Sequence, residues 1–214
     1  MDEPTPLRRG FHRQLDVIDG KVTELFALVT AGLAAATDTF LAGDRESARA
    51  VADRDELIDS LYHDIETLVE RSLLLQAPVA SELRYLLSVL RIVPELERSG
   101  DLVEHIASRA ARGIGLELSP RIRGLVDRMG EVAFELWRRA ADAFADRDPD
   151  AADRLDRLDD TLDDLHTQFI AELAAGGVAL PVAMEMSLVG RFYERLGDHA
   201  HHIAQRVRYL AQGP

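Results

Sequence analysis

The chain has 214 residues, a net charge of −13 and no cysteine, so disulfides and thiolate metal sites are excluded. The acidic balance argues against binding to a nucleic-acid backbone, and we expect no nucleic-acid partner. Apolar residues make up 47% of the chain, but no uninterrupted apolar run approaches the roughly 20 residues of a membrane span. The first residues, MDEPTPLRRG, lack the apolar segment of a signal peptide. We therefore expect a soluble, cytoplasmic protein.

The composition is typical of helices throughout, being rich in Ala, Leu, Arg, Glu and Asp, and no alternating strand pattern occurs. Glycine, proline and capping residues mark well-spaced breaks. These breaks predict six long helices, at residues 11–43, 44–76, 79–112, 120–147, 149–175 and 181–211. Because the connections are short, neighbouring helices should be antiparallel.

One eleven-residue phrase occurs twice, as ERSGDLVEHIA at 97–107 and as ERLGDHAHHIA at 194–204. A second pair, DELIDSLYHDI at 55–65 and DDTLDDLHTQF at 159–169, matches more loosely. The offsets are 97 (194 − 97) and 104 (159 − 55), and their difference of seven residues is about two helical turns. The sequence therefore predicts an all-α fold of two tandem, pseudo-symmetric three-helix bundles, residues 1–117 and 118–214.

The repeated phrases place acidic residues four apart, which puts them on one face of a helix. The first repeat carries Asp55, Asp59, Glu97 and Asp101, and the second carries Asp159, Asp163, Glu194 and Asp198. If the second and third helices of each repeat pack antiparallel, four carboxylates converge and must be solvated, protonated or neutralised by cations. Oxygen ligands favour hard or borderline divalent metals. His105 and His202 continue the rows one turn further, and an imidazole favours a transition metal.

Two interpretations of these rows stay open, a pair of metal sites and a pair of solvated acidic faces. Glu97 lies in phase with an apolar stripe that includes Leu86 and Val93. A carboxylate on an apolar face is unfavourable unless something neutralises its charge, which favours the metal interpretation. Asp55 and Asp59 lie beside their apolar stripe, as expected of a solvated face. No phosphate-binding loop, GxSxG or HExxH motif occurs, and no nucleophile is paired with a base, so we do not expect an enzyme.

The segments QAPVASELR at 76–84, ELERSGDLVEHIA at 95–107 and ERLGDHAHHIA at 194–204 together resemble the two repeats of the PhoU family of phosphate-signalling regulators. The resemblance implies a non-enzymatic negative regulator of the phosphate-starvation response and of phosphate uptake. Its implied partners are the ATPase subunit of a phosphate ABC transporter and a PhoR-type sensor histidine kinase. Membrane association would be peripheral, through these partners, and a homodimer is expected.

Some members of that family carry multinuclear metal clusters on such acidic motifs. The resemblance therefore implies metal binding by the eight acidic residues, with iron as the first choice and zinc, manganese or magnesium as alternatives. The alternative function is a carboxylate-bridged di-metal oxidase or a metal-storage bundle, which usually needs paired ExxH motifs. The chain offers only Asp163-x-x-His166. A purely structural helical scaffold is the third interpretation.

Overall fold

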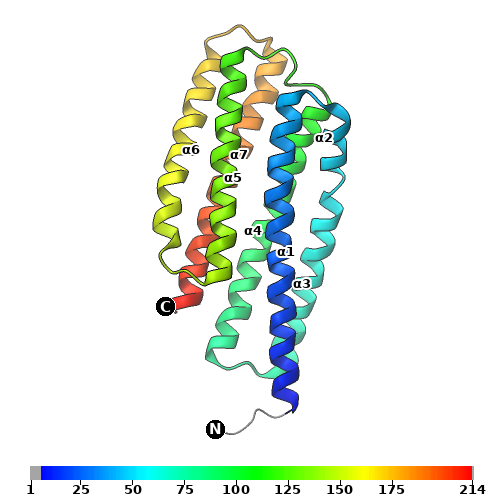
Figure 1. Ribbon diagram of the computed structural model, residues 1–214, viewed down its shortest axis with the longest axis vertical. Helices are drawn as coiled ribbons and strands as arrows, with labels where there is room; N and C mark the ends of the chain where they lie inside the picture. The colour runs from blue at the N-terminus through cyan, green and yellow to red at the C-terminus, as the bar shows by residue number, and fades with distance from the viewer. Residues whose placement is uncertain (1–5, 214) are drawn as a thin grey trace.

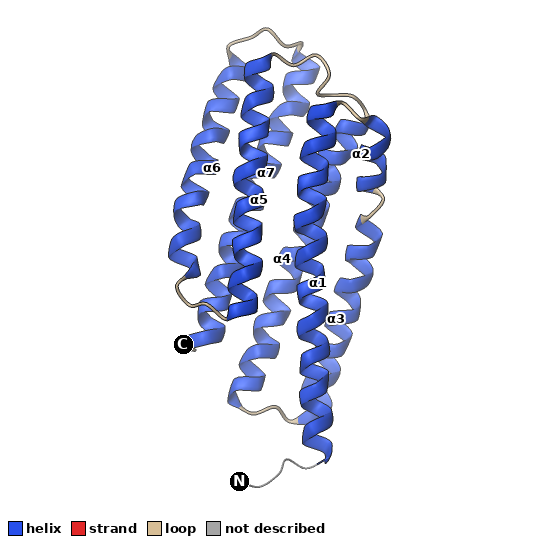
Figure 2. Cartoon of the chain, in the orientation of Figure 1, coloured by secondary structure: helices blue, strands red, loops and turns tan. Residues whose placement is uncertain are grey.

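The computed structural model describes residues 6–213, and every regular element within this range is an α-helix (Figures 1 and 2). The all-α prediction is thus confirmed. Residues 1–5 and 214, which include the outer ends of the two expected repeats and half of the MDEPTPLRRG segment, lie outside the described residues. The helices are α1 (Pro6–Ala42), α2 (Arg45–Ala52), α3 (Asp55–Gln76), α4 (Ala80–Ala111), α5 (Pro120–Asp146), α6 (Ala151–Ala174) and α7 (Leu180–Gln212).

The prediction of one helix over 44–76 is wrong, because a turn at Asp53 and Arg54 divides it into α2 and α3. Both residues keep right-handed helical dihedrals, but the hydrogen bonds around them shorten to the i→i+3 type. The Arg54 N–H donates to the Val51 carbonyl at 3.2 Å, and the Leu57 N–H donates to the Arg54 carbonyl at 3.0 Å. No glycine or proline lies at this turn, so the spacing of helix breakers does not reveal it. The other five helices begin and end within five residues of the expected positions.

The helix ends follow from the capping residues that precede or end them. Gly43 adopts a left-handed φ of 70° directly after α1, and Asp44 then caps α2 by accepting a hydrogen bond from the Ser47 N–H at 3.0 Å. Ser119 caps α5 by accepting from the Ile122 N–H at 3.3 Å, with Pro120 in the first turn. These local signals are readable in the sequence because each depends on residues within one turn.

The seven helices form two bundles that lie side by side (Figure 1). Helices α1 to α4 pack together in the first repeat, and α5, α6 and α7 pack together in the second. The main contacts between the repeats are those of the first helices, α1 with α5, and of the last helices, α4 with α7. The expected boundary at 117/118 falls in the connection between α4 and α5.

Helix α1 is apolar enough, with a mean hydropathy of 1.7 over an 18-residue window, to match a membrane span by length and composition alone. The side chains responsible for this value are core residues. Ile18, Val22, Leu25, Val29 and Leu33 are each 0% exposed, packed among α3, α4 and α5. A core helix shared by two bundles needs apolar residues around much of its circumference, which explains the high hydropathy.

The contact between α1 and α5 depends on a glycine. A Cβ at Gly130 would lie only 2.4 Å from Cγ2 of Thr37 on α1. The Thr37 hydroxyl in turn lies 2.8 Å from the hydroxyl of the fully buried Tyr193 of α7, and the two form a hydrogen bond. Thr37 is β-branched and held in a helix, so its side chain has little freedom to move away.

We predict that Gly130→Ala lowers the free energy of unfolding by about 1–3 kcal/mol, because the new methyl group overpacks the contact between the repeats. Chemical denaturation measures this change. Gly124→Ala on the same helix is the matched control, since a Cβ there meets no atom within 4 Å. That variant should be neutral or more stable by up to about 1 kcal/mol, because alanine favours the helix. Equal stability of the two variants would contradict the packing argument.

Candidate metal centres

A glycine at the same place in both repeated motifs brings the two acidic rows together. A Cβ at Gly100 of α4 would lie 2.9 Å from Cδ1 of Ile58 and 3.2 Å from Oδ1 of Asp55, both on α3. A Cβ at Gly197 of α7 would lie 2.5 Å from Oδ1 of Asp159 on α6. Each glycine directly precedes the aspartate that ends its ExxxD motif. The close approach at the glycine therefore places Asp55 of α3, or Asp159 of α6, next to the ExxxD carboxylates of the following helix.

The first cluster combines Asp55 and Asp59 of α3 with Glu97 and Asp101 of α4. Burial, and then the negative charges of Asp101 and its neighbours, raise the pKa of Asp55 from its ordinary 3.8 to about 6. Burial and the nearby carboxylates also raise the pKa values of Glu97 and Asp101. Oδ1 of Asp55 is buried and has no hydrogen-bond partner among the described residues. The four predicted residues of this repeat are therefore neighbours, with one buried oxygen left for a ligand.

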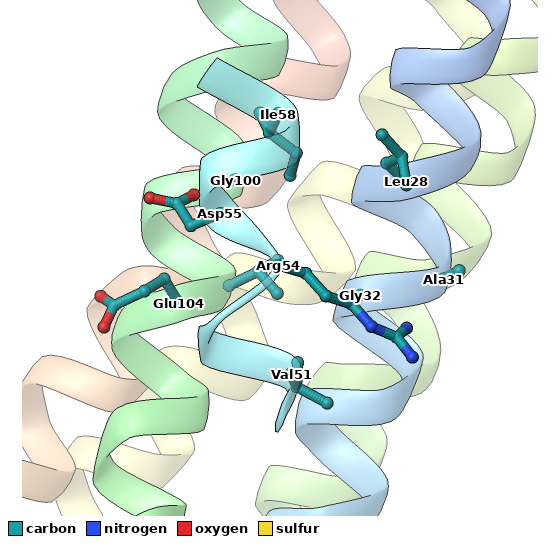
Figure 3. Close-up of a pocket in the computed structure, with 10 residues that line it drawn as sticks. Leu28, Ala31, Gly32, Val51, Arg54, Asp55, Ile58, Gly100 and Glu104 are labelled. Carbon is teal, nitrogen blue, oxygen red and sulfur yellow. The ribbon is translucent and has the colours of Figure 1, made fainter. Parts of the chain in front are cut away.

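Figure 3 shows the inner side of this cluster. The carboxylates of Asp55 and Glu104 turn away from α1, whereas the guanidinium group of Arg54 lies toward α1. Between them, against Gly100, is a cavity of about 40 Å³. Such a space admits a water molecule or a single ion and excludes an organic ligand.

The second cluster combines Asp159 and Asp163 of α6 with Glu194 and Asp198 of α7. Burial, and then the charges of Asp198, Asp163 and Glu194, raise the pKa of Asp159 to about 7. Burial chiefly raises the pKa values of Asp163 and Glu194 as well. Arg191 forms an ion pair with Oε1 of Glu194, while Oε2 is buried without a hydrogen-bond partner among the described residues. The two clusters thus have the same acidic residue types at corresponding positions. The second differs in that an arginine, Arg191, forms an ion pair with its glutamate.

The donor set suits a hard or borderline divalent cation, which would relieve the repulsion and occupy the unpartnered oxygens. The side chains are not fully arranged for one, however. Within residues 6–213, no three His, Asp or Glu side chains are already grouped as ligands of one ion. The carboxylates would have to rotate onto a metal, so the clusters provide ligands and charge but no preformed coordination geometry.

The two candidate histidines occupy different environments. His105 lies one turn beyond Asp101, where its charge only partly offsets the rise in the pKa of that carboxyl caused by burial; its Nδ1 is 2.5 Å from Oε2 of Glu104, and its ring is 5.4 Å from that of Phe192 on α7. His202 lines a groove between α4 and α7 with Arg98 and Glu95 of α4. It is therefore turned toward the other repeat, although the row from Glu194 to Asp198 continues through it in sequence.

A third histidine, His199, was not among the predicted site residues, yet it is buried between the repeats. Ser99 donates to the Glu95 carbonyl at 2.7 Å, so Nδ1–H of His199, 2.8 Å from the Ser99 hydroxyl oxygen, donates to that oxygen. Burial, and then the charges of Arg195, His202 and Arg98, lower the pKa of His199 to about 4, which keeps the ring neutral near pH 7. A single histidine within a polar row carries no sequence signal for such burial.

The family model of the PhoU domain matches this chain twice, over residues 22–110 and 126–207. A Mycobacterium leprae protein named phosphate-specific transport system accessory protein PhoU homolog 1 is 33% identical over 97% of this chain and 95% of its own length. The corresponding PhoU homolog 2 of Mycobacterium tuberculosis is 34% identical over 97% and 99%. The crystal structure of PhoU from Pseudomonas aeruginosa is 29% identical, covers 95% of this chain and 100% of that chain, and superposes with a TM-score of 0.89.

Fold and sites together define a class of helical proteins with two similar repeats, each of which carries a cluster of four acidic residues between its last two helices. The chain belongs to the PhoU family, because the family model matches it once in each repeat and most of its length is covered. The resemblance inferred from the motifs is thereby confirmed.

We predict that the carboxylates of the acidic clusters make the metal-free protein less stable as the pH rises from about 4 to about 8, against the opposite effect of His199, whose lowered pKa adds stability between about 4 and 6.5. The folded Asp159 carboxyl, with its pKa near 7, holds its proton more tightly than the unfolded chain, whose ordinary pKa is 3.8. Stability is therefore lost as the pH passes upward through that range, by about 1–2 kcal/mol for this group after solvent screening. Thermal melts in chelator across this pH range measure the effect.

Asp159→Asn should flatten this pH dependence, because the amide does not titrate. Asp164→Asn is the control, since Asp164 is an exposed residue on the same helix outside the cluster. A wild-type pH profile in the Asp159→Asn variant would show that repulsion at the second cluster is not felt by the folded protein.

Proposed function

We propose that this protein is a negative regulator of the phosphate-starvation response and of phosphate uptake. It acts in the cytoplasm as an adaptor between the ATPase subunit of a phosphate ABC transporter and a PhoR-type sensor histidine kinase. It reaches the membrane only through these partners and functions as a homodimer without catalytic activity. The observation that carries the proposal is membership of the PhoU family over both repeats, together with the names of the curated relatives as phosphate-specific transport system accessory proteins.

We further propose that each acidic cluster binds divalent metal, with iron first and zinc, manganese or magnesium as alternatives. Asp55, Asp59, Glu97 and Asp101 would hold metal in the first repeat. Asp159, Asp163, Glu194 and Asp198 would do so in the second. The buried, unpartnered oxygens of Asp55 and Glu194 support this assignment, as do the raised pKa values around them. A bound cation would neutralise each cluster and link two helices of a repeat.

The two histidines receive different roles in this proposal. His105 can extend the first site only after its side chain rotates, because its Nδ1 lies 2.5 Å from Glu104 and its ring lies 5.4 Å from that of Phe192 of α7. His202 would need to turn away from the groove that it lines to join the second site. We therefore assign His202 as a ligand only in a rearranged, metal-bound state.

The alternative, a di-metal oxidase or metal-storage bundle, has less support from the side chains. Such bundles usually supply two ExxH pairs from facing helices. His166 is the nearest approximation, and its pKa is lowered by burial and by the charge of Arg191, which lies beside the cluster. An arginine next to the metal ligands opposes a second cation, so a binding or regulatory role for metal is the better match.

The metal proposal predicts that chelator lowers the melting temperature and that iron, manganese, zinc or magnesium restores it. A metal at a hundredfold excess over its dissociation constant stabilises the folded state by roughly 2.7 kcal/mol. The double variant Glu97→Gln, Glu194→Gln should lose this metal-dependent shift and keep its helix content by circular dichroism. If no ion shifts the melting temperature of the unmodified protein, the clusters are solvated acidic faces.

The regulatory proposal predicts that deletion of the gene raises expression of phosphate-starvation genes in phosphate-rich medium. A transcriptional reporter measures this response, and reintroduction of the unmodified gene should reverse it. The Glu97→Gln, Glu194→Gln variant, introduced in the same way, reports whether regulation requires the clusters. Unchanged reporter activity in the deletion strain would contradict the regulatory role.

A further inference from the structure

A basic groove lies between α4 and α7, on the contact that joins the two repeats, and has a volume of about 480 Å³. Arg91 and Arg98 line it from α4, and His202 and Arg206 line it from α7. Glu95 is the one carboxylate in its lining. A concave concentration of positive charge is unexpected in a chain whose net charge is −13.

The arginines of this groove are only weakly neutralised. Arg98 lies 3.7 Å from Glu95, which is a loose ion pair, and its side chain is 57% exposed. Across residues 6–213, neither Arg91 nor Arg206 forms an ion pair or donates a side-chain hydrogen bond to any described residue. Their guanidinium groups are therefore available to a ligand that enters the groove.

The internal repeat provides a comparison within the same molecule. The offset of 97 residues that relates Glu97 to Glu194 also relates Arg109 to Arg206 and His105 to His202. Arg109 lies 3.0 Å from Glu185, and its guanidinium carbon lies 4.8 Å above the ring of Phe192. Arg109, the counterpart of Arg206 in the first repeat, is thus neutralised by a carboxylate and covered by an aromatic ring.

The positions that correspond to Glu185 and Phe192 in the first repeat are Ser88 and Glu95. Ser88 supplies no charge, and Glu95 lies 3.8 Å from Nε2 of His199 as well as near Arg98. Arg206 therefore lacks both the carboxylate and the aromatic cover of its counterpart. The charge of the groove comes from a specific departure from the repeat and does not follow from the general composition.

We propose that this groove binds a small polyanion that carries two or more phosphate groups. Guanidinium groups match phosphate oxygens with paired hydrogen bonds, and three arginines arranged around one hollow favour several phosphates over one. The volume falls in the range of small-molecule sites, roughly 300–1,000 Å³, and exceeds the needs of a single phosphate ion. The lining of the groove includes none of the eight acidic cluster residues and shares only His202 with the proposed metal sites, and the proposal does not depend on the proposed regulatory function.

The test is isothermal titration of the purified full chain with pyrophosphate, tripolyphosphate and ATP at low salt. Chelator is present, so that no metal on the acidic clusters can bind phosphate. We expect saturable binding that strengthens from pyrophosphate to tripolyphosphate. Arg206→Gln should weaken the affinity for tripolyphosphate about tenfold or more, because it removes one charged hydrogen-bonding group. Gln205→Glu should weaken it to a similar extent, because it adds a negative charge to the lining of the groove.

Arg109→Gln is the matched control, because it removes the equivalent arginine from the neutralised end of the same contact. It should leave the affinity for tripolyphosphate within about twofold of the unmodified protein, with helix content checked by circular dichroism. Equal weakening by Arg109→Gln and Arg206→Gln would overturn the site in favour of general charge attraction. Absence of saturable binding by all three ligands, or stronger binding of an acidic peptide such as oligoglutamate, would overturn it too. None of these results bears on regulation of the phosphate response.

Discussion

The approach of α4 to α3 at Gly100, and of α7 to α6 at Gly197, is the contact on which both acidic clusters depend. Any side chain at these glycines would meet an aspartate or an apolar group of the neighbouring helix. The approach forces like charges together and removes water from them, which raises their pKa values. Burial of apolar side chains beside the clusters, such as Ile58, Ile65 and Leu162, offsets this cost at about 1.5–3 kcal/mol each.

The two clusters are similar in composition and different in surroundings. In the first, α3 begins at Asp55, directly after the turn that separates it from α2. In the second, Asp159 lies well inside the continuous helix α6, and Arg191 forms an ion pair with one carboxylate oxygen of Glu194. A cation at the second cluster would have to displace or accommodate that arginine. The two copies of the acidic row would therefore differ in their affinity for the proposed metal.

The contact between α4 and α7 joins the repeats, and the residues that the two repeats contribute to it differ. Ser99 and His199 form a buried hydrogen bond there, whereas the positions related to them by the repeat offset are Leu196 and Leu102. A buried polar pair is stable only when both groups are satisfied, so it fixes the register of one helix on the other. Positive charge is unevenly distributed along the same contact. Arg109 is neutralised by Glu185, whereas Arg206 lines the open groove without such a partner among the described residues.

The sequence by itself determined the helices, the duplication and the acidic rows, because helical periodicity and capping depend only on residues within one or two turns. It could not locate the turn at Asp53, where no breaker residue occurs, or the burial of His199. Helix α7 contacts α4, α5 and α6, and periodicity shows which residues share a face but not which neighbour that face meets. His202 therefore continues the acidic row in sequence, yet tertiary packing places it in the arginine groove between α4 and α7.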